Sequence, residues 1–292
     1  FWLKVEFMVL LVLPEVAQRP PSREHGVNEF QERRLRNYGA DLIQRAGILL
    51  RLTQLAIVAS QTIFQRFYFR KSFAEFDVRP IAAACAFLGT KLCEEHRKLP
   101  AVAGIFLQLT TGEDGERAEG PSSPLFNPFK SRVERYERLV LKELGFVLGQ
   151  FLEHPHTYVL HYVEALDLPK SVIASAWGYC NDSLRTGVSC TSQPTAAAAA
   201  AISLACRAND VVLPKCPPWW EVLDTSIDEL RVVEEAIWDL YDQPKPEYLS
   251  VSKDQGDADV EEPRPQNGES AAGLVRTTSA SSRPALSRTK SR

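Results

Sequence analysis

The sequence predicts an all-α protein made of two helical bundles in tandem, followed by a disordered tail. Apolar residues recur at helical spacing from residue 37 to about residue 244. Two alanine-rich segments, each opened by a proline, repeat along the chain, and no stretch alternates apolar and polar residues as strands do. With 292 residues, 45% apolar and 24% charged, the chain is long enough to bury one large core or two smaller ones.

Three apolar stripes predict helices of the first bundle in order. Each stripe has the spacing that places its side chains on one face of a helix. The stripes are Leu42, Ile43, Ala46 and Leu49, then Ala56, Ala59, Ile63 and Phe67, then Val133, Tyr136, Val140 and Leu144. Thr53 is placed to cap the second of these helices, and Gly145 to end the third.

The alanine-rich segments predict the central helix of each bundle. Pro80 opens one and Pro194 the other, and proline suits the first turn of a helix because its missing N–H costs nothing there. Small side chains let neighbouring helices approach closely from all sides. The alternative is that alanine serves only as a strong helix former on the surface. The run Ala196–Ala201 has no charged residue to solvate an exposed face, which favours the central position.

Composition predicts the segments that flank and interrupt the bundles. Residues 14–35 are polar and contain Pro20, so we expect a linker. A stretch rich in glycine, proline and acids after Thr110 predicts a surface loop, and the polar end of the chain predicts disorder. The predicted domains are a leader and linker at 1–35, a first bundle at 36–148 with a loop insertion at 109–128, a second bundle at 152–245 and a tail at 246–292.

Charge and residue spacing argue against several classes of protein. The formal charge of −3 argues against a broad nucleic-acid-binding surface, and the arginines among aromatic residues at Arg66 and Arg70 are better interpreted as a solvated face beside a core. The six cysteines lack zinc-site spacing and indicate buried groups of an intracellular protein. His154, His156 and His161 form no pair on one helix face, so we expect no metal or other cofactor.

The first residues carry the only feature that favours secretion or a membrane. Phe7–Leu13 is an apolar run, but Glu6 interrupts it and no basic region precedes it. We interpret residues 1–13 as a fragment edge or a misassigned leader. No run of about twenty apolar residues predicts a membrane span.

Several segments of the predicted bundles resemble one known family. They are Leu42–Arg51, Ile63–Phe73, Leu139–Phe146 with His154–His156, and Asn181–Thr186. The first two resemble the opening helices of the cyclin box in L-type cyclins, and the third resembles the junction between boxes in transcriptional cyclins. Asn181–Thr186 is similar to the L-type subgroup rather than to cyclins at large. The resemblance covers roughly residues 36–245 and implies two five-helix cyclin boxes.

This resemblance implies a regulatory protein rather than an enzyme. A cyclin L-like subunit binds and activates a cyclin-dependent serine/threonine kinase, as a heterodimer in the nucleus, in RNA polymerase II transcription and in pre-mRNA splicing. No small-molecule substrate, cofactor or membrane is implied. Activation is allosteric, because the cyclin binds the active arrangement of the kinase more tightly and shifts its population.

Three charged residues are predicted to bind the kinase. Glu137 has no cation one turn away on its own helix, and Lys91 lies near the end of the first alanine-rich segment, shortly before Glu94. In the family, the matching lysine and glutamate contact the kinase's mobile helix and the start of its strand. The resemblance therefore implies that Lys91, Glu137 and Glu94 bind the kinase, the alternative being ordinary surface charge. Cys93 stands where the family has the first of two glutamates.

Two other functions stay open from the sequence. The main alternative is a cyclin-fold transcription factor of the TFIIB type, an adaptor that binds DNA and polymerase. That class is expected to show a zinc ribbon and a basic surface, and neither is present in the sequence. L-type cyclins often end in arginine–serine repeats that engage splicing factors, and Ser282-Arg283, Ser287-Arg288 and Ser291-Arg292 echo such repeats. A simple disordered tail explains the same composition.

Overall fold

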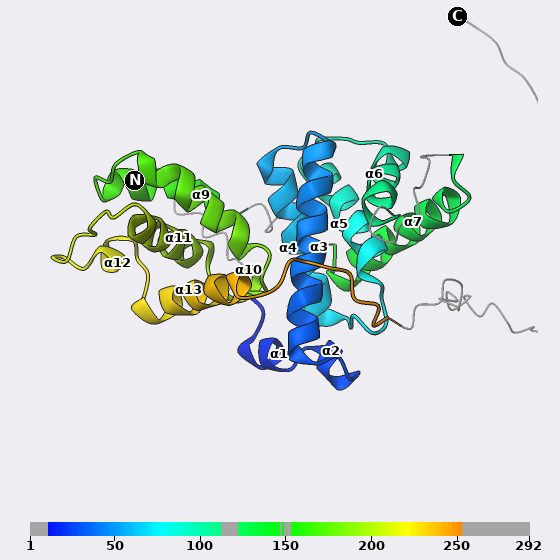
Figure 1. Ribbon diagram of the computed structural model, residues 1–292, viewed down its shortest axis with the longest axis horizontal. Coiled ribbons are helices and arrows are strands. Elements are labelled where there is room, and N and C mark those ends of the chain that lie inside the picture. Colours follow the sequence, from blue (N-terminus) through cyan, green and yellow to red (C-terminus); the bar gives the residue numbers. More distant parts are fainter. Residues whose placement is uncertain (1–10, 112–121, 147, 149–152, 253–292) are drawn as a thin grey trace, which may run out of the picture. The chain divides into compact units, whose positions relative to one another are not determined.

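The computed structural model describes residues 11–111, 122–146, 148 and 153–252, which contain thirteen helices and no strand (Figure 1). The all-α prediction is confirmed for this part of the chain. The helices are α1 (Pro14–Gln18), α2 (Pro21–Glu24), α3 (Glu29–Leu49), α4 (Gln54–Arg70), α5 (Val78–Leu92), α6 (Leu99–Thr111), α7 (Phe126–Glu143), α8 (His156–Ala165), α9 (Ser171–Ser183), α10 (Val188–Thr191), α11 (Pro194–Ala208), α12 (Trp219–Val222) and α13 (Ile227–Tyr241).

The alanine-rich helices α5 and α11 are the central helices of two bundles, as predicted. Helix α5 contacts α3, α4, α6 and α7, and α11 contacts α8, α9 and α13. Every residue from Ala196 to Cys206 in α11 is buried, so the alternative of a surface helix is wrong. The bounds of the two predicted domains stay a prediction, because residues 11–252 belong to one compact unit.

Helix α5 packs unusually close to α4, and Gly89 is the reason that it can. A Cβ added at Gly89 would lie 2.0 Å from the Ser60 hydroxyl oxygen and 2.9 Å from the backbone oxygen of Ala56. The Ser60 hydroxyl donates to that same oxygen at 2.6 Å, so it has a partner inside the contact. The position of α5 against α4 therefore depends on the missing side chain.

Local capping explains where the main helices begin and end. The Thr53 hydroxyl accepts from the Ala56 N–H, which confirms the predicted cap of α4. Gly145 has φ of +70° directly after α7, which confirms the predicted stop. Pro80 is not the first residue of α5, because Asp77 caps this helix by accepting from the Arg79 N–H at 2.9 Å. The proline then occupies the third helical position, where its missing N–H has no partner to lose.

Residues 14–35 are not the polar linker that composition predicts. They form α1, α2 and the first turns of α3, which begins after a capping box at Asn28. The inner side of this part of α3 is charged, since Glu32 and Arg36 are 4% and 5% exposed. An ion pair takes part of the buried face in these first turns of α3, so the apolar stripe of the helix becomes continuous only further along and the sequence pattern misses its start.

The insertion and the tail are both shorter than predicted within the described residues. Helix α6 continues to Thr111 and α7 begins at Phe126, so the loop spans less than 109–128. Residues 246–252, assigned to a disordered tail, pack on the first bundle. The core of the insertion at 112–121, the rest of the tail at 253–292 and residues 1–10 lie outside the described part.

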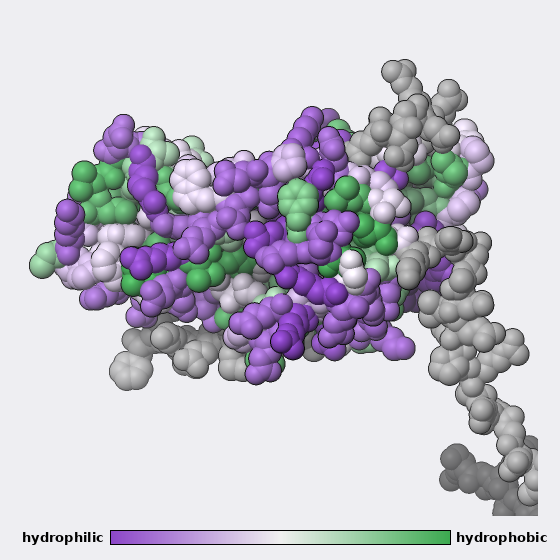
Figure 2. Space-filling model, turned by 60° about the horizontal axis from the view of Figure 1, so that its bottom comes forward, coloured by the Kyte–Doolittle hydropathy of each residue, from purple (hydrophilic) through white to green (hydrophobic). Residues whose placement is uncertain are grey.

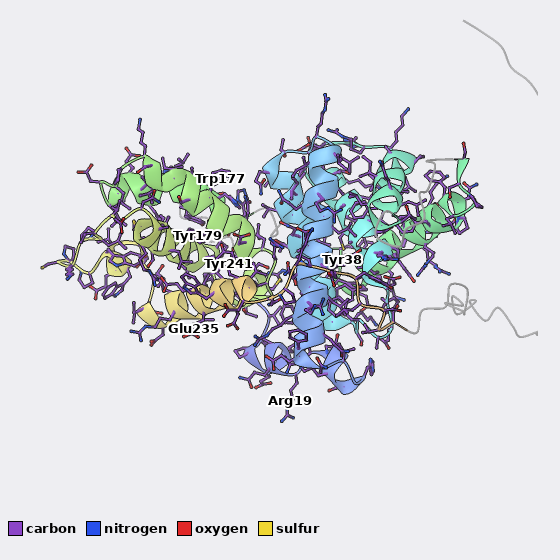
Figure 3. All side chains as sticks on the ribbon, viewed as in Figure 1. Arg19, Tyr38, Trp177, Tyr179, Glu235 and Tyr241 are labelled. Atoms are coloured by element: carbon purple, nitrogen blue, oxygen red, sulfur yellow. The ribbon has the colours of Figure 1, made fainter. Side chains whose placement is uncertain are left out.

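Tyr248 anchors residues 246–252, which we call the strap. The strap follows α13 and crosses α3 to reach the start of α5 (Figure 1). The Arg79 guanidinium lies 3.6 Å from the centre of the Tyr248 ring, and the Tyr248 hydroxyl donates to Asp77 at 3.3 Å. Tyr38, labelled on α3 in Figure 3, has its ring 5.8 Å from that of Tyr248. The strap thus binds the residue that caps α5.

The segment Asn181–Thr186 joins the two bundles, and we call it the joint. Its Asn181 side-chain oxygen accepts from the Gln54 amide at 2.6 Å and lies 2.9 Å from Nε2 of His156. Gln65 on α4 donates to the Leu184 carbonyl at 3.3 Å. Because both bundles supply donors to one short segment, this segment fixes the contact between α4 and the second bundle.

Polar contacts also spread from the joint to α3 and α13. Arg185 donates to the Asn37 side chain at 3.0 Å and lies 3.6 Å from Asp41, both on α3. The Tyr241 hydroxyl donates to Asp182 at 2.7 Å, and Figure 3 shows Tyr241 and Tyr179 between α13 and α9. The segment that resembles the L-type subgroup therefore has a structural role that does not depend on a partner.

Replacing Gly89 by alanine should destabilise the fold, since the added methyl group meets α4. We expect Gly89→Ala to lower the free energy of unfolding by about 1–3 kcal/mol, measured by urea denaturation. Gly178→Ala in α9 is the matched control, because nothing lies within 4 Å of its added Cβ. This control should be neutral or stabilising by up to about 1 kcal/mol. Equal effects of the two substitutions would contradict the close α4–α5 contact.

Acidification should destabilise the joint through His156. Burial lowers the pKa of His156 from 6.5 to about 4, so in this window the unfolded chain binds a proton that the folded chain does not. Stability is therefore lost as pH falls from 6.5 towards 4, by about 3 kcal/mol at most. Urea denaturation at several pH values measures this slope.

The comparison is made in a His154→Gln background, because burial also lowers the pKa of His154. Adding His156→Gln should flatten the pH dependence. Adding His161→Gln, at an exposed position, is the control and should leave it in place. An unchanged slope in the His156 variant would show that another group titrates.

Candidate functional site

Lys91 and Glu137 form an ion pair across the two helices α5 and α7. Lys91 lies in the last turn of α5 and Glu137 in the second half of α7, 46 residues later. The side chain of Lys91 is 45% exposed and that of Glu137 is 12% exposed. The sequence indicated correctly that Glu137 lacks a partner on its own helix, but it did not reveal that Lys91 is the partner. The structure thus brings two of the three predicted residues together.

The ring of Phe87 lies against the Lys91 ammonium of this pair. Phe87 precedes Lys91 by one helical turn, and the Lys91 ammonium lies 4.1 Å from the centre of the ring. Phe87 is 8% exposed and belongs to the core of the first bundle. A lysine ammonium over an aromatic face is attracted by the ring quadrupole. The sequence places Phe87 one helical turn before Lys91, but this spacing alone does not predict a cation–π contact.

Glu94 is placed apart from the pair and in a strained backbone conformation. It follows the end of α5 with φ of +59°, in the left-handed region that favours glycine. Its N–H donates to the Lys91 carbonyl at 3.2 Å, and the next N–H, of Glu95, donates to Thr90 at 2.8 Å. These are the two bonds of a Schellman motif. The Glu94 carboxylate is exposed and makes no hydrogen bond or ion pair within the described residues.

Glu95 has a structural role, which separates it from Glu94. Its carboxylate accepts from the Thr53 N–H at 3.1 Å and also from the Thr53 hydroxyl, at the start of α4. Negative charge at a helix N-terminus is favourable. Cys93, which stands where the family has a glutamate, is half-buried, and burial raises the pKa of its thiol to about 11. A thiol with so high a pKa stays uncharged, so this position lacks the negative charge of the glutamate that the family has there.

An exposed aromatic residue, missed by the sequence analysis, follows α7. Phe146 is 70% exposed and comes directly after the Gly145 stop, with its N–H bound to the Leu141 carbonyl at 3.0 Å. Polar side chains cover most of the described surface on the face drawn in Figure 2, and apolar residues occupy separate patches. Phe146 is one of several large apolar side chains that the described surface exposes, and it lies at the end of the helix that carries Glu137.

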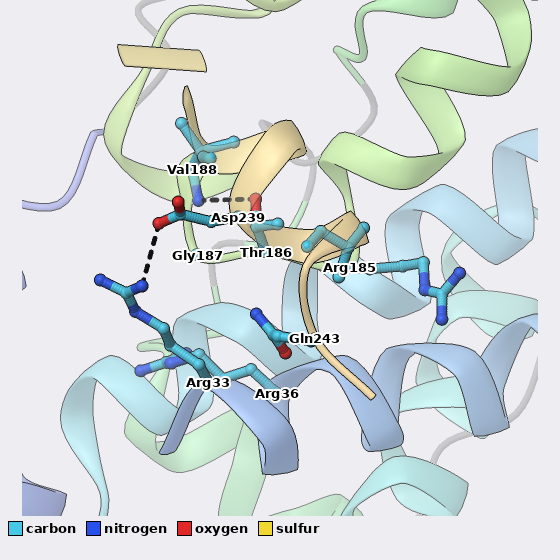
Figure 4. A pocket seen from close by; sticks show the side chains of 10 residues that line it. Arg33, Arg36, Arg185, Thr186, Gly187, Val188, Asp239 and Gln243 are labelled. Carbon is cyan, nitrogen blue, oxygen red and sulfur yellow. Dashed lines mark hydrogen bonds and ion pairs between the residues drawn. The ribbon is translucent and has the colours of Figure 1, made fainter. Parts of the chain in front are cut away.

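A cavity of about 160 Å³ lies between α3, the end of the joint and α13 (Figure 4). Its charged lining is already paired, since Arg33 binds Asp239 at 2.9 Å and Arg185 lies 3.6 Å from both Asp41 and Asp182. Arg36, also in the lining, is bound to Glu32. These cations are compensated within the protein, so the cavity offers no excess charge for an ionic ligand.

The described residues contain no arrangement of three or more His, Cys, Asp or Glu side chains able to hold a metal ion. His154 and His156 lie with their rings 5.4 Å apart, but Nε2 of His156 faces Asn181 in the joint. The aromatic residues near Arg66 are core residues and Arg70 is exposed, as expected. Arg66 itself is only 7% exposed, so the expectation that it lies on a solvated face is wrong. In the described part of the chain, no helix has the length and apolar character needed to cross a membrane.

Comparison with known proteins decides the family. No family model matches the chain. The chain is 38% identical over 242 residues to Cyclin-L1-1 of Arabidopsis thaliana, an alignment that covers 82% of this chain and 58% of that protein. It is 36% identical over 251 residues to human Cyclin-L1, covering 83% of this chain and 47% of that protein. The chain is a cyclin L-like protein. It spans about half the length of the curated relatives it matches.

Solved structures show the same fold as this cyclin L-like chain. One belongs to the crystal structure of the yeast RNA Pol II CTD kinase CTDK-1 complex, with a TM-score of 0.66 and 16% identity over 80% of this chain and 73% of that chain. Another belongs to the CAK complex from Chaetomium thermophilum bound to ATP-gamma-S, with a TM-score of 0.56 and 16% identity over 79% of this chain and 76% of that chain. These likenesses confirm the predicted fold of two tandem cyclin boxes.

Relieving the backbone strain at Glu94 should stabilise the cyclin L-like chain. Glycine adopts the left-handed region without the steric cost of a Cβ, so Glu94→Gly should raise the free energy of unfolding by about 1 kcal/mol. Glu94→Ala is the control, because it removes the same carboxylate and keeps the Cβ. Urea denaturation of both variants measures the difference. A Glu94→Gly protein no more stable than Glu94→Ala would rule out the left-handed conformation.

Proposed function

We propose that this chain is the regulatory subunit of a cyclin-dependent serine/threonine kinase that acts in RNA polymerase II transcription. Its relatives are named as L-type cyclins, and the solved structures that share its fold belong to kinase complexes. In this proposal the chain contributes a binding surface, and the catalytic groups belong to the kinase. We further propose that the complex acts in the nucleus and, through residues beyond the bundles, in pre-mRNA splicing.

The observation that carries this proposal is the ion pair between Lys91 and Glu137. The pair connects the central helix of the first bundle to α7 and stays partly exposed. An ammonium has three donors and a carboxylate several acceptor sites, so one mutual bond leaves both groups able to bind further partners. A donor and an acceptor side by side match the carbonyl and N–H groups of a partner's backbone.

The apolar surroundings give the pair the character of an interface centre. Phe87 and the partly buried Leu92 and Leu141 pack in the same core from α5 and α7, and Phe146 projects beyond the end of α7. Interfaces combine aromatic and apolar anchors with a few desolvated polar pairs. In this proposal Glu94 contributes a rim charge, whose removal mainly changes the association rate.

Activation follows from differential binding and requires no chemistry from the chain. A cyclin-dependent kinase whose strand lysine and helix glutamate are separated is inactive until the helix moves inward. A surface that binds only the inward arrangement shifts the population towards it, to the extent of its differential affinity. The packing of α5 against α7 matters here, because a surface that yields to both arrangements would select neither.

Reversing the ion pair should abolish kinase activation while the fold is kept. In the double variant Lys91→Glu with Glu137→Lys, opposite charges still face each other and only the attraction of the ammonium to the Phe87 ring is lost. The thermal unfolding temperature should therefore fall by no more than about 4 °C. The partner, however, meets a carboxylate in place of an ammonium. We expect loss of binding to the kinase that the wild-type chain captures from its own cell extract, and loss of phosphorylation of a polymerase tail peptide.

The second bundle offers a matched control for this reversal. Arg207 and Glu234 form an ion pair between α11 and α13 whose side chains are 55% and 12% exposed, close to the values for Lys91 and Glu137. The variant Arg207→Glu with Glu234→Arg should retain kinase activation. Full activation by a folded Lys91–Glu137 reversal would refute the site, and absence of any captured kinase would refute the function.

A further inference from the structure

We infer that Phe87 is a positioning residue, which holds the Lys91 ammonium against Glu137 before any partner binds. This inference rests on the proposed kinase-binding role of Lys91 and adds the device that orients it. The Lys91 ammonium lies 4.1 Å from the centre of the Phe87 ring and is paired with Glu137. Phe87 therefore takes no part in recognition itself and acts through Lys91.

The burial of the three groups shows which of them holds the others. Phe87 is 8% exposed and fixed in the core of the first bundle, and the Glu137 side chain is 12% exposed. The Lys91 side chain is 45% exposed. A lysine has one of the most flexible side chains, and fixing it costs conformational entropy. Phe87 and Glu137, the two buried groups, thus hold the exposed Lys91 side chain. The entropy lost by fixing Lys91 is then lost when the chain folds and not when a partner binds.

The geometry also determines which donor stays available. The ammonium has three N–H groups and no acceptor. One faces the Glu137 carboxylate, and the ring occupies a second side of the ammonium. We infer that the third donor is the one left for a partner. Losing the ring would let Lys91 sample rotamers in which this donor has no fixed direction.

Competing anions near Lys91 are already engaged or directed elsewhere. Glu95 binds Thr53 at the start of α4, and Glu94 lies beyond the end of α5 in the left-handed conformation. Cys93, half-buried, brings no charge. Within the described residues Glu137 is therefore the one carboxylate paired with Lys91, and Phe87 is the ring beneath it.

The first arm of the test uses the full chain without any kinase. Protons on the Lys91 side chain that lie over an aromatic ring are shifted upfield by its ring current, which NMR detects. We expect this shift in the wild type and in Phe87→Tyr, and its loss in Phe87→Leu. Replacement of Phe87 by pentafluorophenylalanine keeps the shape of the ring but reverses its quadrupole, and should displace the ammonium. An unshifted Lys91 in the wild type would overturn the inference whatever the function of the chain.

The second arm measures the affinity of each variant for the kinase captured by the wild-type chain. A cation–π contact at a partly exposed site corresponds to about a two- to fivefold change in an equilibrium constant. We expect Phe87→Leu and the pentafluoro variant to bind two- to fivefold more weakly, and Phe87→Tyr to bind as the wild type does. Circular dichroism checks that each variant is folded. If Phe87→Leu does not fold, the affinity comparison rests on the pentafluoro variant.

Combining the ring substitution with Lys91→Met separates positioning from packing. If Phe87 acts only through Lys91, then Phe87→Leu causes no further loss of affinity in the Lys91→Met background. An equal loss in both backgrounds would overturn the inference, as would unchanged affinity of the pentafluoro variant. If the wild type captures no kinase, the proposed function fails, while the NMR arm still decides whether Phe87 orients Lys91.

Discussion

The buried guanidinium of Arg36 is the interaction on which the arrangement of the helices depends. It donates to Glu32 on its own helix at 2.8 and 3.0 Å, and to the backbone oxygens of Gln65 and Tyr68 on α4, each at 3.1 Å. A charge buried to this extent is tolerable only when it is fully paired, and removing one partner costs about 3–5 kcal/mol. Arg36 therefore fixes α3 against the C-terminal half of α4.

The same guanidinium connects the first bundle to the second. Arg36 also donates to the side-chain oxygen of Gln65, whose amide donates to the Leu184 carbonyl in the joint. Helix α4, held in this way at one end, meets α5 where Gly89 removes the side chain between them. The direction of α5 sets the place of Lys91. A polar network at the C-terminal half of α4 and a missing methyl group beside its N-terminal half thus determine where the ammonium lies.

The sequence predicted those parts of the fold whose chemistry is local or periodic. The Thr53 cap, the Gly145 stop and the buried alanines of α11 follow from residue type and spacing, and the structure confirms each of them. The first turns of α3 were missed because Glu32 and Arg36 occupy the buried face in place of apolar residues. A pattern that equates burial with apolar side chains cannot detect an interior ion pair.

Contacts between distant segments explain the rest of what was missed. Glu137 was selected because no cation stands one turn away on its own helix, and Lys91 because of the family resemblance, whereas their mutual bond spans 46 residues. Tyr248 lies in a segment of polar composition, yet its ring finds Arg79 and Tyr38 on the first bundle. Neither pairing leaves a trace in local composition, because each depends on where folding brings another element.

The strap makes the first bundle discontinuous in the chain. Leu249 and Val251 pack against its core, and they are reached only after the chain has passed through the whole second bundle. The second bundle is thus enclosed between two pieces of the first, as an inserted domain is. During synthesis, the first bundle is incomplete until its last piece has emerged. Excision or exchange of either bundle at a single cut between them would therefore separate part of the first bundle from its own core.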